Sequence, residues 1–162
     1  MRARANTLSR GPRPSSFARV PGIDYGDLEG YYGYALRRAQ IASFDAFFRA
    51  TAGAGITPPR FTALVILEAN AGITQSLLGA ALGTARSGAM MLTDWLVEHG
   101  LAERRHRKDD GRVWGLYLTA RGTALLARMR RRVREREKVF SGRLTPRERA
   151  ELKRLLAKLT DW

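Results

Sequence analysis

A charged hairpin pattern in residues 101–118 constrains the fold of this 162-residue chain more than any other feature. The runs LAERRH and VWGLYL are strand-like, and RKDDG between them contains an Asp-Gly pair typical of hairpin turns. Trp114, Leu116 and Leu118 alternate along the second run, which predicts that they share the packed face of a strand. The pattern therefore predicts a hairpin with one apolar arm and one cationic arm.

Two short helices are predicted directly before this hairpin. Thr74 is the N-cap candidate of QSLLGAAL, which stops at Gly83, and Gly100 ends the second helix, RSGAMMLTDWLVEH. Two helices separated by a glycine-containing turn, the second of them amphipathic, form a helix-turn-helix pattern. Followed by the hairpin, they predict a winged helix-turn-helix over residues 57–119.

Longer helices flank this unit. Apolar residues spaced by three and four predict a helix over 24–51, and a basic helix follows over 120–140. The capping box TPRE starts a last helix over 145–161. The fold class is therefore mainly α with a small β-hairpin wing. We expect residues 1–22, with five Arg and no acidic residue, to form a flexible basic arm, and residues 23–162 to form a single domain.

The charge balance narrows the class of partner. Lys and Arg number 29 against 15 Asp and Glu, which gives a net charge of +14 and points to nucleic acid or an anionic membrane surface. No apolar run approaches the roughly 18 residues of a membrane span, and the basic start lacks the apolar core of a secretory signal. The absence of cysteine excludes disulfides and thiolate metal sites and fits a reducing cytoplasm.

An enzyme is not expected. The two histidines, His99 and His106, lack metal-ligand spacing with a carboxylate pair, and no nucleophile motif or phosphate loop is present. We therefore predict no catalytic residues, no metal site and no cofactor.

The order of these elements resembles the MarR family of winged helix-turn-helix regulators over roughly residues 25–161. The most specific part runs from LVEHGLAERR through DDGR to LYLTARG, and LTPRERAELKRLLAKL is similar to the family's last helix. Within the family, DYGDLEGYYGYALRRAQIASF and ITPPRFTALVILEANAGITQSLLGAALG look most like regulators of aromatic-acid and hydroxycinnamoyl-thioester catabolism.

The resemblance implies a homodimer joined by the first and the last two helices. It implies operator DNA with the recognition helix in its major groove and the wing at its minor groove. A phenolic effector, an aromatic acid or its CoA thioester, would bind between the dimer helices and the DNA-binding lobe and release a repressor of aromatic-compound catabolism.

The resemblance also assigns the wing residues. Arg112 matches the wing-tip arginine that enters the minor groove, where a narrow groove concentrates negative potential. Asp110 matches an aspartate that holds the wing through a salt bridge, and Arg107 and Lys108 add positive charge. Gly111 stands where many relatives carry Arg, a departure that lowers the charge and eases a tight turn. A merely solvated charge run is the alternative.

The recognition helix departs further from the family, because Gly88, Met90 and Met91 stand where many relatives carry Ser or Thr and Arg. Arg86 can bind guanine bidentately, Ser87 can bind phosphate, and the methionines can contact thymine methyl groups. For Met91, core packing is favoured over a DNA contact. The residues expected to face outward are Arg86, Ser87, Met90 and Asp94.

The ligand candidates are Tyr31, Tyr34, Arg37, Arg38 and Phe61. A phenolic ring binds aromatic walls, and guanidinium groups bind a carboxylate or the phosphates of CoA. Packing of the tyrosines and Phe61 as ordinary core residues stays equally open.

A second function also stays open. A non-enzymatic basic protein can bind an anionic membrane surface or nucleic acid without ligand control. Residues 125–140 carry charge on both faces, which argues against insertion into a membrane, so no membrane partner is expected. Glu135 and Glu137 interleave with the arginines as intrahelical partners, which favours a solvated dimer-helix face over a DNA contact.

Overall fold

The computed structural model describes residues 19–107 and 110–160. They fall into two compact units that divide between Asp45 and Ala46. Most of the arm predicted over residues 1–22, and Lys108 of the wing, lie outside the described residues.

The first unit contains a 3-10 helix, η1 (Gly26–Gly30), and most of α1 (Tyr32–Ala50), which continues across the boundary into the second unit. The predicted start of this helix at residue 24 is wrong. Gly26 has a φ of 55°, its N–H donates to Asp24 Oδ1 at 2.9 Å, and Tyr31 is extended. A left-handed glycine and an extended residue cannot continue an α-helix, so regular helix begins only at Tyr32.

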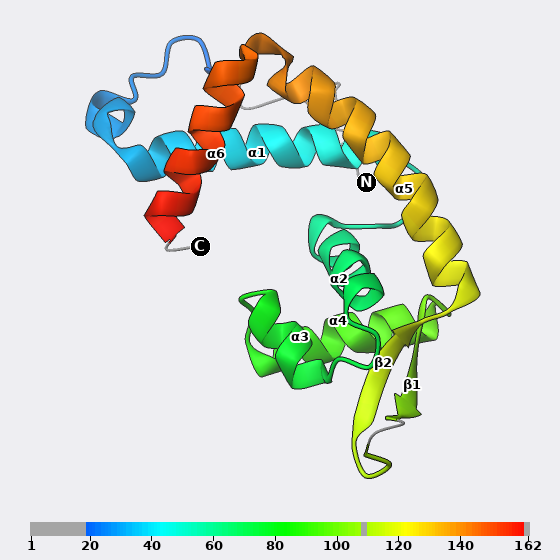
Figure 1. Ribbon diagram of the computed structural model, residues 1–162. Helices are drawn as coiled ribbons and strands as arrows, with labels where there is room; N and C mark the ends of the chain where they lie inside the picture. The colour runs from blue at the N-terminus through cyan, green and yellow to red at the C-terminus, as the bar shows by residue number, and fades with distance from the viewer. Residues whose placement is uncertain (1–18, 108–109, 161–162) are drawn as a thin grey trace, which may run out of the picture. The chain divides into compact units, whose positions relative to one another are not determined.

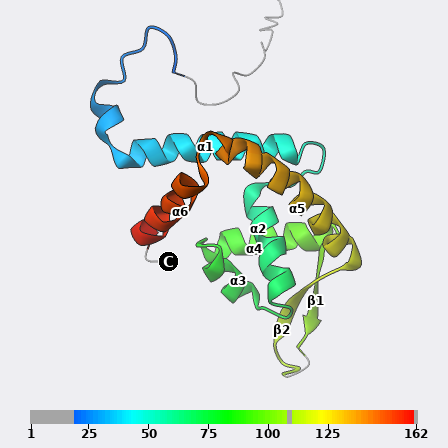
Figure 2. The ribbon, with the colours of Figure 1, turned by 45° about the horizontal axis from the view of Figure 1, so that its top comes forward.

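The second unit is a winged helix-turn-helix followed by two helices (Figures 1 and 2). Its elements are α2 (Pro58–Ala69), α3 (Gln75–Ala81), α4 (Arg86–Glu98), β1 (Ala102–His106), β2 (Trp114–Leu118), α5 (Ala120–Phe140), η2 (Ser141–Arg143) and α6 (Pro146–Thr160). The predicted fold class, mainly α with a small β-hairpin wing, is confirmed.

The hairpin is antiparallel, with Ala102 opposite Leu118 and His106 opposite Trp114. The loop between α2 and α3 extends it, because the Gly72 N–H donates to the Leu116 carbonyl at 2.8 Å. Gly115 makes this approach possible: a Cβ there would lie 2.8 Å from the Cα of Gly72. These contacts attach β2 to the helices.

One apolar core joins the helices to the hairpin. Its members come from α2, α3, α4, β1, β2, α5 and the adjoining loops, and they include Leu64, Leu67, Leu78, Leu96, Leu101, Leu116, Leu125, Leu126 and Met129. Because one cluster includes α4 and β2, the recognition helix and the wing belong to the same packed unit.

Local capping signals act as the sequence indicates. Thr74 Oγ1 accepts from the Leu77 N–H at 3.3 Å, and Gly100 has a φ of 63° after α4. In the capping box of α6 the Thr145 N–H donates to Glu148 Oε2 at 2.7 Å, and the Glu148 N–H donates to Thr145 Oγ1 at 3.3 Å. In the part of the chain that the structure describes, no helix combines the length and the apolar character that crossing a bilayer requires.

Candidate nucleic-acid interface

Helix α4 presents its small and apolar side chains inward. Ala89, Thr93 and Leu96 are buried, and the Thr93 hydroxyl donates to the Ala89 carbonyl at 2.8 Å. Met91 lies on the opposite side of the helix, since successive residues turn by 100°, and it is 69% exposed. The favoured interpretation of Met91 as a core residue is therefore wrong, and Met90 is exposed beside it.

The first turn of α4 is open to a partner. Arg86 and Ser87 are exposed, and the N-cap residue Ala85 supplies no side-chain hydrogen bond to the first N–H groups. Gly88 has a packing role, because a Cβ there would lie 2.5 Å from Thr84 Oγ1. The N–H groups that lack a side-chain cap, together with Arg86, make this turn electropositive and suited to an anionic partner.

The wing tip is organised by Asp110. Its Oδ1 accepts from the backbone N–H of Arg112 at 3.0 Å and from Nε of Arg112 at 3.3 Å. The Arg112 side chain is 93% exposed, so the guanidinium is oriented at its base and still open to a partner. Asp110 thus forms a salt bridge, as the resemblance implies, and the structure identifies its partner as Arg112.

The other wing residues differ in their placement. The Arg107 N–H donates to the Val113 carbonyl at 2.9 Å, and the residue is half-buried. Gly111 does not have the left-handed φ that favours glycine, and a Cβ there would meet nothing within 4 Å. The turn therefore does not require this glycine, contrary to the expectation that it eases a tight turn.

Trp114 does not pack as the alternation predicts. It is 55% exposed, and its ring centroid lies 4.0 Å from that of His106, its cross-strand partner. Leu116 is 2% exposed and Leu118 packs against the core, so only this end of β2 meets the helices. Alternation selects a face of the strand, but burial also needs an element on that face.

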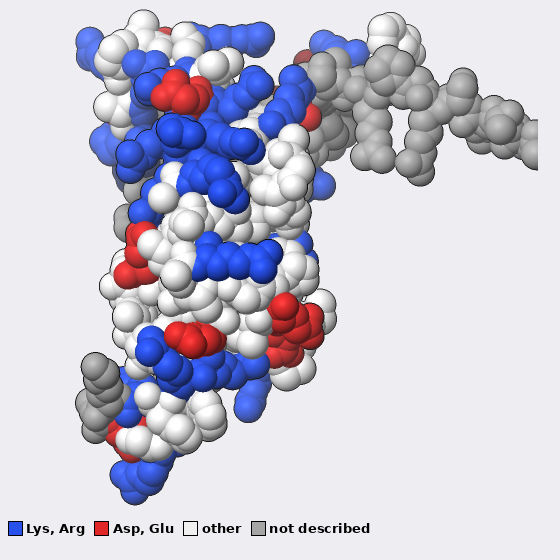
Figure 3. All heavy atoms as spheres, turned by 90° about the vertical axis from the view of Figure 1, so that its right-hand side faces the viewer, with Lys and Arg blue, Asp and Glu red and all other residues white. Residues whose placement is uncertain are grey.

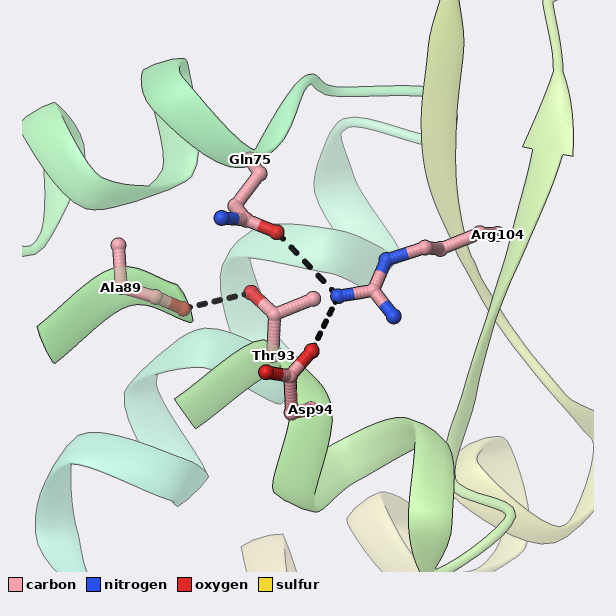
Figure 4. Close-up of polar contacts among 5 residues, drawn as sticks. All are labelled: Gln75, Ala89, Thr93, Asp94 and Arg104. Carbon is pink, nitrogen blue, oxygen red and sulfur yellow. Dashed lines mark hydrogen bonds and ion pairs between the residues drawn. The ribbon is translucent and has the colours of Figure 1, made fainter. Parts of the chain in front are cut away.

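A polar contact that the sequence does not reveal joins β1 to both short helices (Figure 4). Nη2 of Arg104 donates to Asp94 Oδ1 of α4 at 2.5 Å and to Gln75 Oε1 of α3 at 3.3 Å. Opposite charges on a predicted helix and a predicted strand are the only sequence signal for such a pair. Its partners are identified only once the strand is placed against the helix.

Figure 3 shows a second concentration of Lys and Arg, over the C-terminal half of α5, in addition to the one on the hairpin. Exposed arginines of α5 include Arg128, Arg131, Arg132, Arg134 and Arg136. Glu135 accepts from Lys138 at 3.1 Å, as expected for an intrahelical partner, and Arg130 pairs with Glu68 of α2 at 2.5 Å. Acidic partners thus offset only part of the charge of this helix.

The candidate ligand residues of the first unit form one close pair. Cζ of Arg38 lies 5.8 Å from the ring centroid of Tyr34. The Tyr31 hydroxyl donates to Asp27 Oδ2 at 2.9 Å, and Nη1 of Arg37 donates to Gln40 Oε1 at 3.2 Å. Tyr34 and Arg38 are therefore brought together, whereas Tyr31 and Arg37 have other partners.

Phe61 belongs to the second unit, where it is half-buried against the core, 5.6 Å from the ring of Phe47. Nearby on α4, Trp95 packs against two side chains: Cζ of Arg60 lies 3.5 Å from its ring and His99 stacks on it at 3.8 Å. The guanidinium of Arg60 and the ring of His99 would clash if both lay at these distances on one face of the indole. They therefore cover its opposite faces. Among the described residues, no three His, Asp or Glu side chains gather as a metal site.

Comparisons with known proteins agree with this architecture. Residues 54–113 match the sequence profile of the MarR family. A protein of Thauera aromatica, described as a transcriptional regulatory protein for the hcr operon, is 36% identical over 136 residues, 83% of this chain and 82% of that protein.

Solved structures extend the match over most of the chain. The repressor CouR bound to a 23-mer DNA duplex is similar with a TM-score of 0.79 and 34% identity, over 85% of this chain and 98% of that chain. CouR bound to p-coumaroyl-CoA is similar with a TM-score of 0.78 and 32% identity, over 85% of this chain and 97% of that chain. The regulator PcaV of Streptomyces coelicolor, in complex with its natural ligand, is similar with a TM-score of 0.74 and 27% identity, over 86% of this chain and 98% of that chain. The chain therefore belongs to the MarR family of winged helix-turn-helix, DNA-binding transcriptional regulators.

Proposed function

We propose that this chain is a cytoplasmic repressor that binds an operator duplex as a homodimer and is released by an aromatic acid or its CoA thioester. The observation that carries the proposal is the pair of exposed basic elements within one packed unit. The first turn of α4 carries Arg86, and the wing tip carries Arg112, held by Asp110.

These two elements suit the two grooves of a duplex. The major groove admits an α-helix, and Arg86 and Ser87 have the donors that guanine and phosphate oxygens accept. A narrow minor groove attracts an inserted guanidinium, and the Arg112 side chain is 93% exposed while Asp110 holds its Nε. Arg107 and the exposed Met90 and Met91 complete the contact surface.

The dimer is proposed from α6. None of its residues from Pro146 to Thr160 is buried, although it carries four leucines at helical spacing. The exposed leucines are Leu152, Leu155, Leu156 and Leu159. A soluble monomer rarely exposes a contiguous apolar face of this kind, and a second copy of the chain would cover it.

The effector class is proposed from Tyr34 and Arg38 together with two relatives. An aromatic ring beside a guanidinium suits an aromatic acid or an acyl-CoA. CouR is a relative solved with p-coumaroyl-CoA, and PcaV one solved with its natural ligand. Release requires that the effector bind the DNA-incompatible state more tightly, because equal affinity for both states shifts no population.

The test uses the full chain and duplexes selected from a random DNA pool, with fluorescence anisotropy at a fixed salt concentration. We expect pseudopalindromic sites with half-sites about one helical turn apart. Addition of p-coumaroyl-CoA or p-coumaric acid should release the duplex, whereas CoA alone should not. Binding that shows no sequence preference, or equal binding to anionic vesicles, would contradict the repressor.

The Arg37→Ala/Arg38→Ala variant separates the two effector forms. If only the thioester loses affinity, the arginines bind the CoA portion. If both the acid and the thioester bind as before, the effector site lies elsewhere.

A further inference from the structure

Three elements of the second unit meet at the guanidinium of Arg104. Its Nη2 donates to Asp94 on α4 at 2.5 Å and to Gln75, the first residue of α3, at 3.3 Å. Arg104 lies opposite Leu116 in the hairpin, and residues directly opposite each other share one face. Leu116 is buried, so Arg104 leaves the hairpin on the face that packs against the helices (Figure 4).

The position of Arg104 along β1 gives the contact its importance. Burial on this strand ends at Ala102, and every residue from Arg104 to His106 is exposed. Between the buried start of β1 and the wing tip, Arg104 thus attaches the strand to α3 and α4 through its polar contacts. On β2, the contact of Gly115 with Gly72 supplies the matching attachment.

We infer that the Asp94–Arg104 ion pair positions the wing against the recognition helix, so that Arg112 and the first turn of α4 engage the same duplex. The inference rests on the proposed function. Both side chains are partly exposed, at 35% for Arg104 and 43% for Asp94, and ion pairs of this kind contribute little to global stability. Their effect is expected in the geometry of the wing and hence in DNA affinity.

Removal of the negative charge of Asp94 can distinguish a positioning role from a purely electrostatic effect on DNA affinity. Asp94 is an acidic group on the helix that approaches DNA, so removal of its charge should strengthen binding if charge alone matters. If Asp94 holds Arg104 in place, the same change should weaken binding. The two explanations therefore predict opposite outcomes for Asp94→Asn.

The matched control is Glu98→Gln. Glu98 is exposed on the same helix, one turn further along, and its substitution changes the net charge by the same amount. At one salt concentration we expect Asp94→Asn to bind the selected duplex about tenfold more weakly than the wild type, and Glu98→Gln to bind equally or more tightly. If Asp94→Asn binds as tightly as Glu98→Gln, the inference is wrong.

A double-mutant cycle with Arg112→Ala tests whether the wing is what moves. In the wild type this substitution should lower affinity by about tenfold or more, and in Asp94→Asn by no more than about twofold, because the displaced wing no longer places Arg112 in the groove. A general loss of folded protein would leave the factor for Arg112 unchanged. Thermal unfolding of each variant checks this directly.

The cycle also distinguishes the two levels of the proposal. If Arg112→Ala has no effect in the wild type, the wing contact of the proposed function is wrong and the positioning role is overturned with it. If Arg112→Ala weakens binding equally in both backgrounds, only the positioning role of Asp94 and Arg104 is overturned. If the factor for Arg112 falls only in Asp94→Asn and not in Glu98→Gln, the inference is supported.

Discussion

Gly79 of α3 lies directly against Ala89 of α4, and a Cβ built on Gly79 would be 2.7 Å from the Ala89 methyl carbon. Both residues are buried. The two helices of the helix-turn-helix therefore meet at a point where one methyl group fits and two do not. The distance between the recognition helix and its supporting helix depends on this pair.

Gly79→Ala should force α3 and α4 apart and destabilise the protein by about 1–3 kcal/mol, the usual range for overpacking. The compensating variant Gly79→Ala/Ala89→Gly moves the methyl group to the other helix. It should recover most of the loss, because the helix-propensity cost of one glycine is removed from α3 and added to α4, so these two changes nearly cancel. Urea denaturation measures both, and equal stability of the single variant and the wild type would contradict the prediction.

Gly122→Ala should destabilise more strongly. Gly122 lies in the first turn of α5, and a Cβ there would lie 2.0 Å from the Leu101 carbonyl oxygen, a backbone atom that cannot rotate away. We expect a loss of about 3 kcal/mol or more, at the upper end for overpacking. Gly142→Ala is the matched control, since a Cβ there meets nothing within 4 Å. It should be neutral or stabilise by up to about 1 kcal/mol.

Arg112→Ala should weaken operator binding by about 1–3 kcal/mol and reduce the salt dependence of binding. The same substitution at Arg131, an exposed arginine of α5, removes an equal charge at a helix not proposed to contact DNA and should cost much less. Anisotropy titrations at several salt concentrations give both quantities. Similar losses for the two variants would mean that general charge, and not the wing tip, binds the duplex.

Leu155→Glu should dissociate the proposed dimer, because it places a charge in the exposed leucine face of α6. Lys153→Glu changes the charge on a different side of the same helix and should leave the dimer intact. Light scattering during size-exclusion chromatography reports the mass of each. A wild-type monomer under conditions of full DNA binding would refute the dimer itself.

The capping box of α6 should respond to acid. Hydrogen bonds from the Thr145 backbone N–H and hydroxyl lower the pKa of Glu148 below its ordinary value of 4.5. Because the folded-state pKa is depressed, the stabilisation by this carboxylate is present above about pH 4.5 and is lost as the pH falls through the folded-state pKa. An NMR titration of the Glu148 carboxyl carbon should show the depression. Thr145→Ala removes the hydroxyl but keeps the backbone N–H, so it should return the pKa only part of the way toward 4.5. A pKa of Glu148 that is not depressed in the wild type would contradict the assignment.

Features set by neighbouring residues were predictable from the sequence. Thr74, Gly100 and the Thr145–Glu148 box act within a few positions of the chain, so their residue types alone locate helix ends. The same holds for the hairpin, whose two runs and turn are contiguous. A salt bridge at Asp110 was implied by the family resemblance, and its partner Arg112 also lies within one turn of the chain.

Features that depend on residues far apart in the sequence were not predictable in this way. Trp114 alternates correctly with Leu116, yet it is 55% exposed, and Met91 is apolar but lies opposite the packed side of α4. The contact of Arg104 with Asp94 depends on how a strand sits against a helix. Residue type gives each side chain a preference, whereas its neighbour in space decides where it lies.

The exposure of Trp114 gives the protein an optical reporter of its own wing. The indole is 55% exposed, lies against the His106 ring and is two residues from the oriented Arg112, so a duplex that receives the arginine should also change the surroundings of the indole. Trp95 differs from Trp114, because Arg60 and His99 lie against its ring. Docking should therefore alter the intrinsic fluorescence without any attached dye, and Trp114→Phe should remove the part of that change that arises at the wing. Wing engagement can then be followed in real time, separately from the total amount of DNA bound.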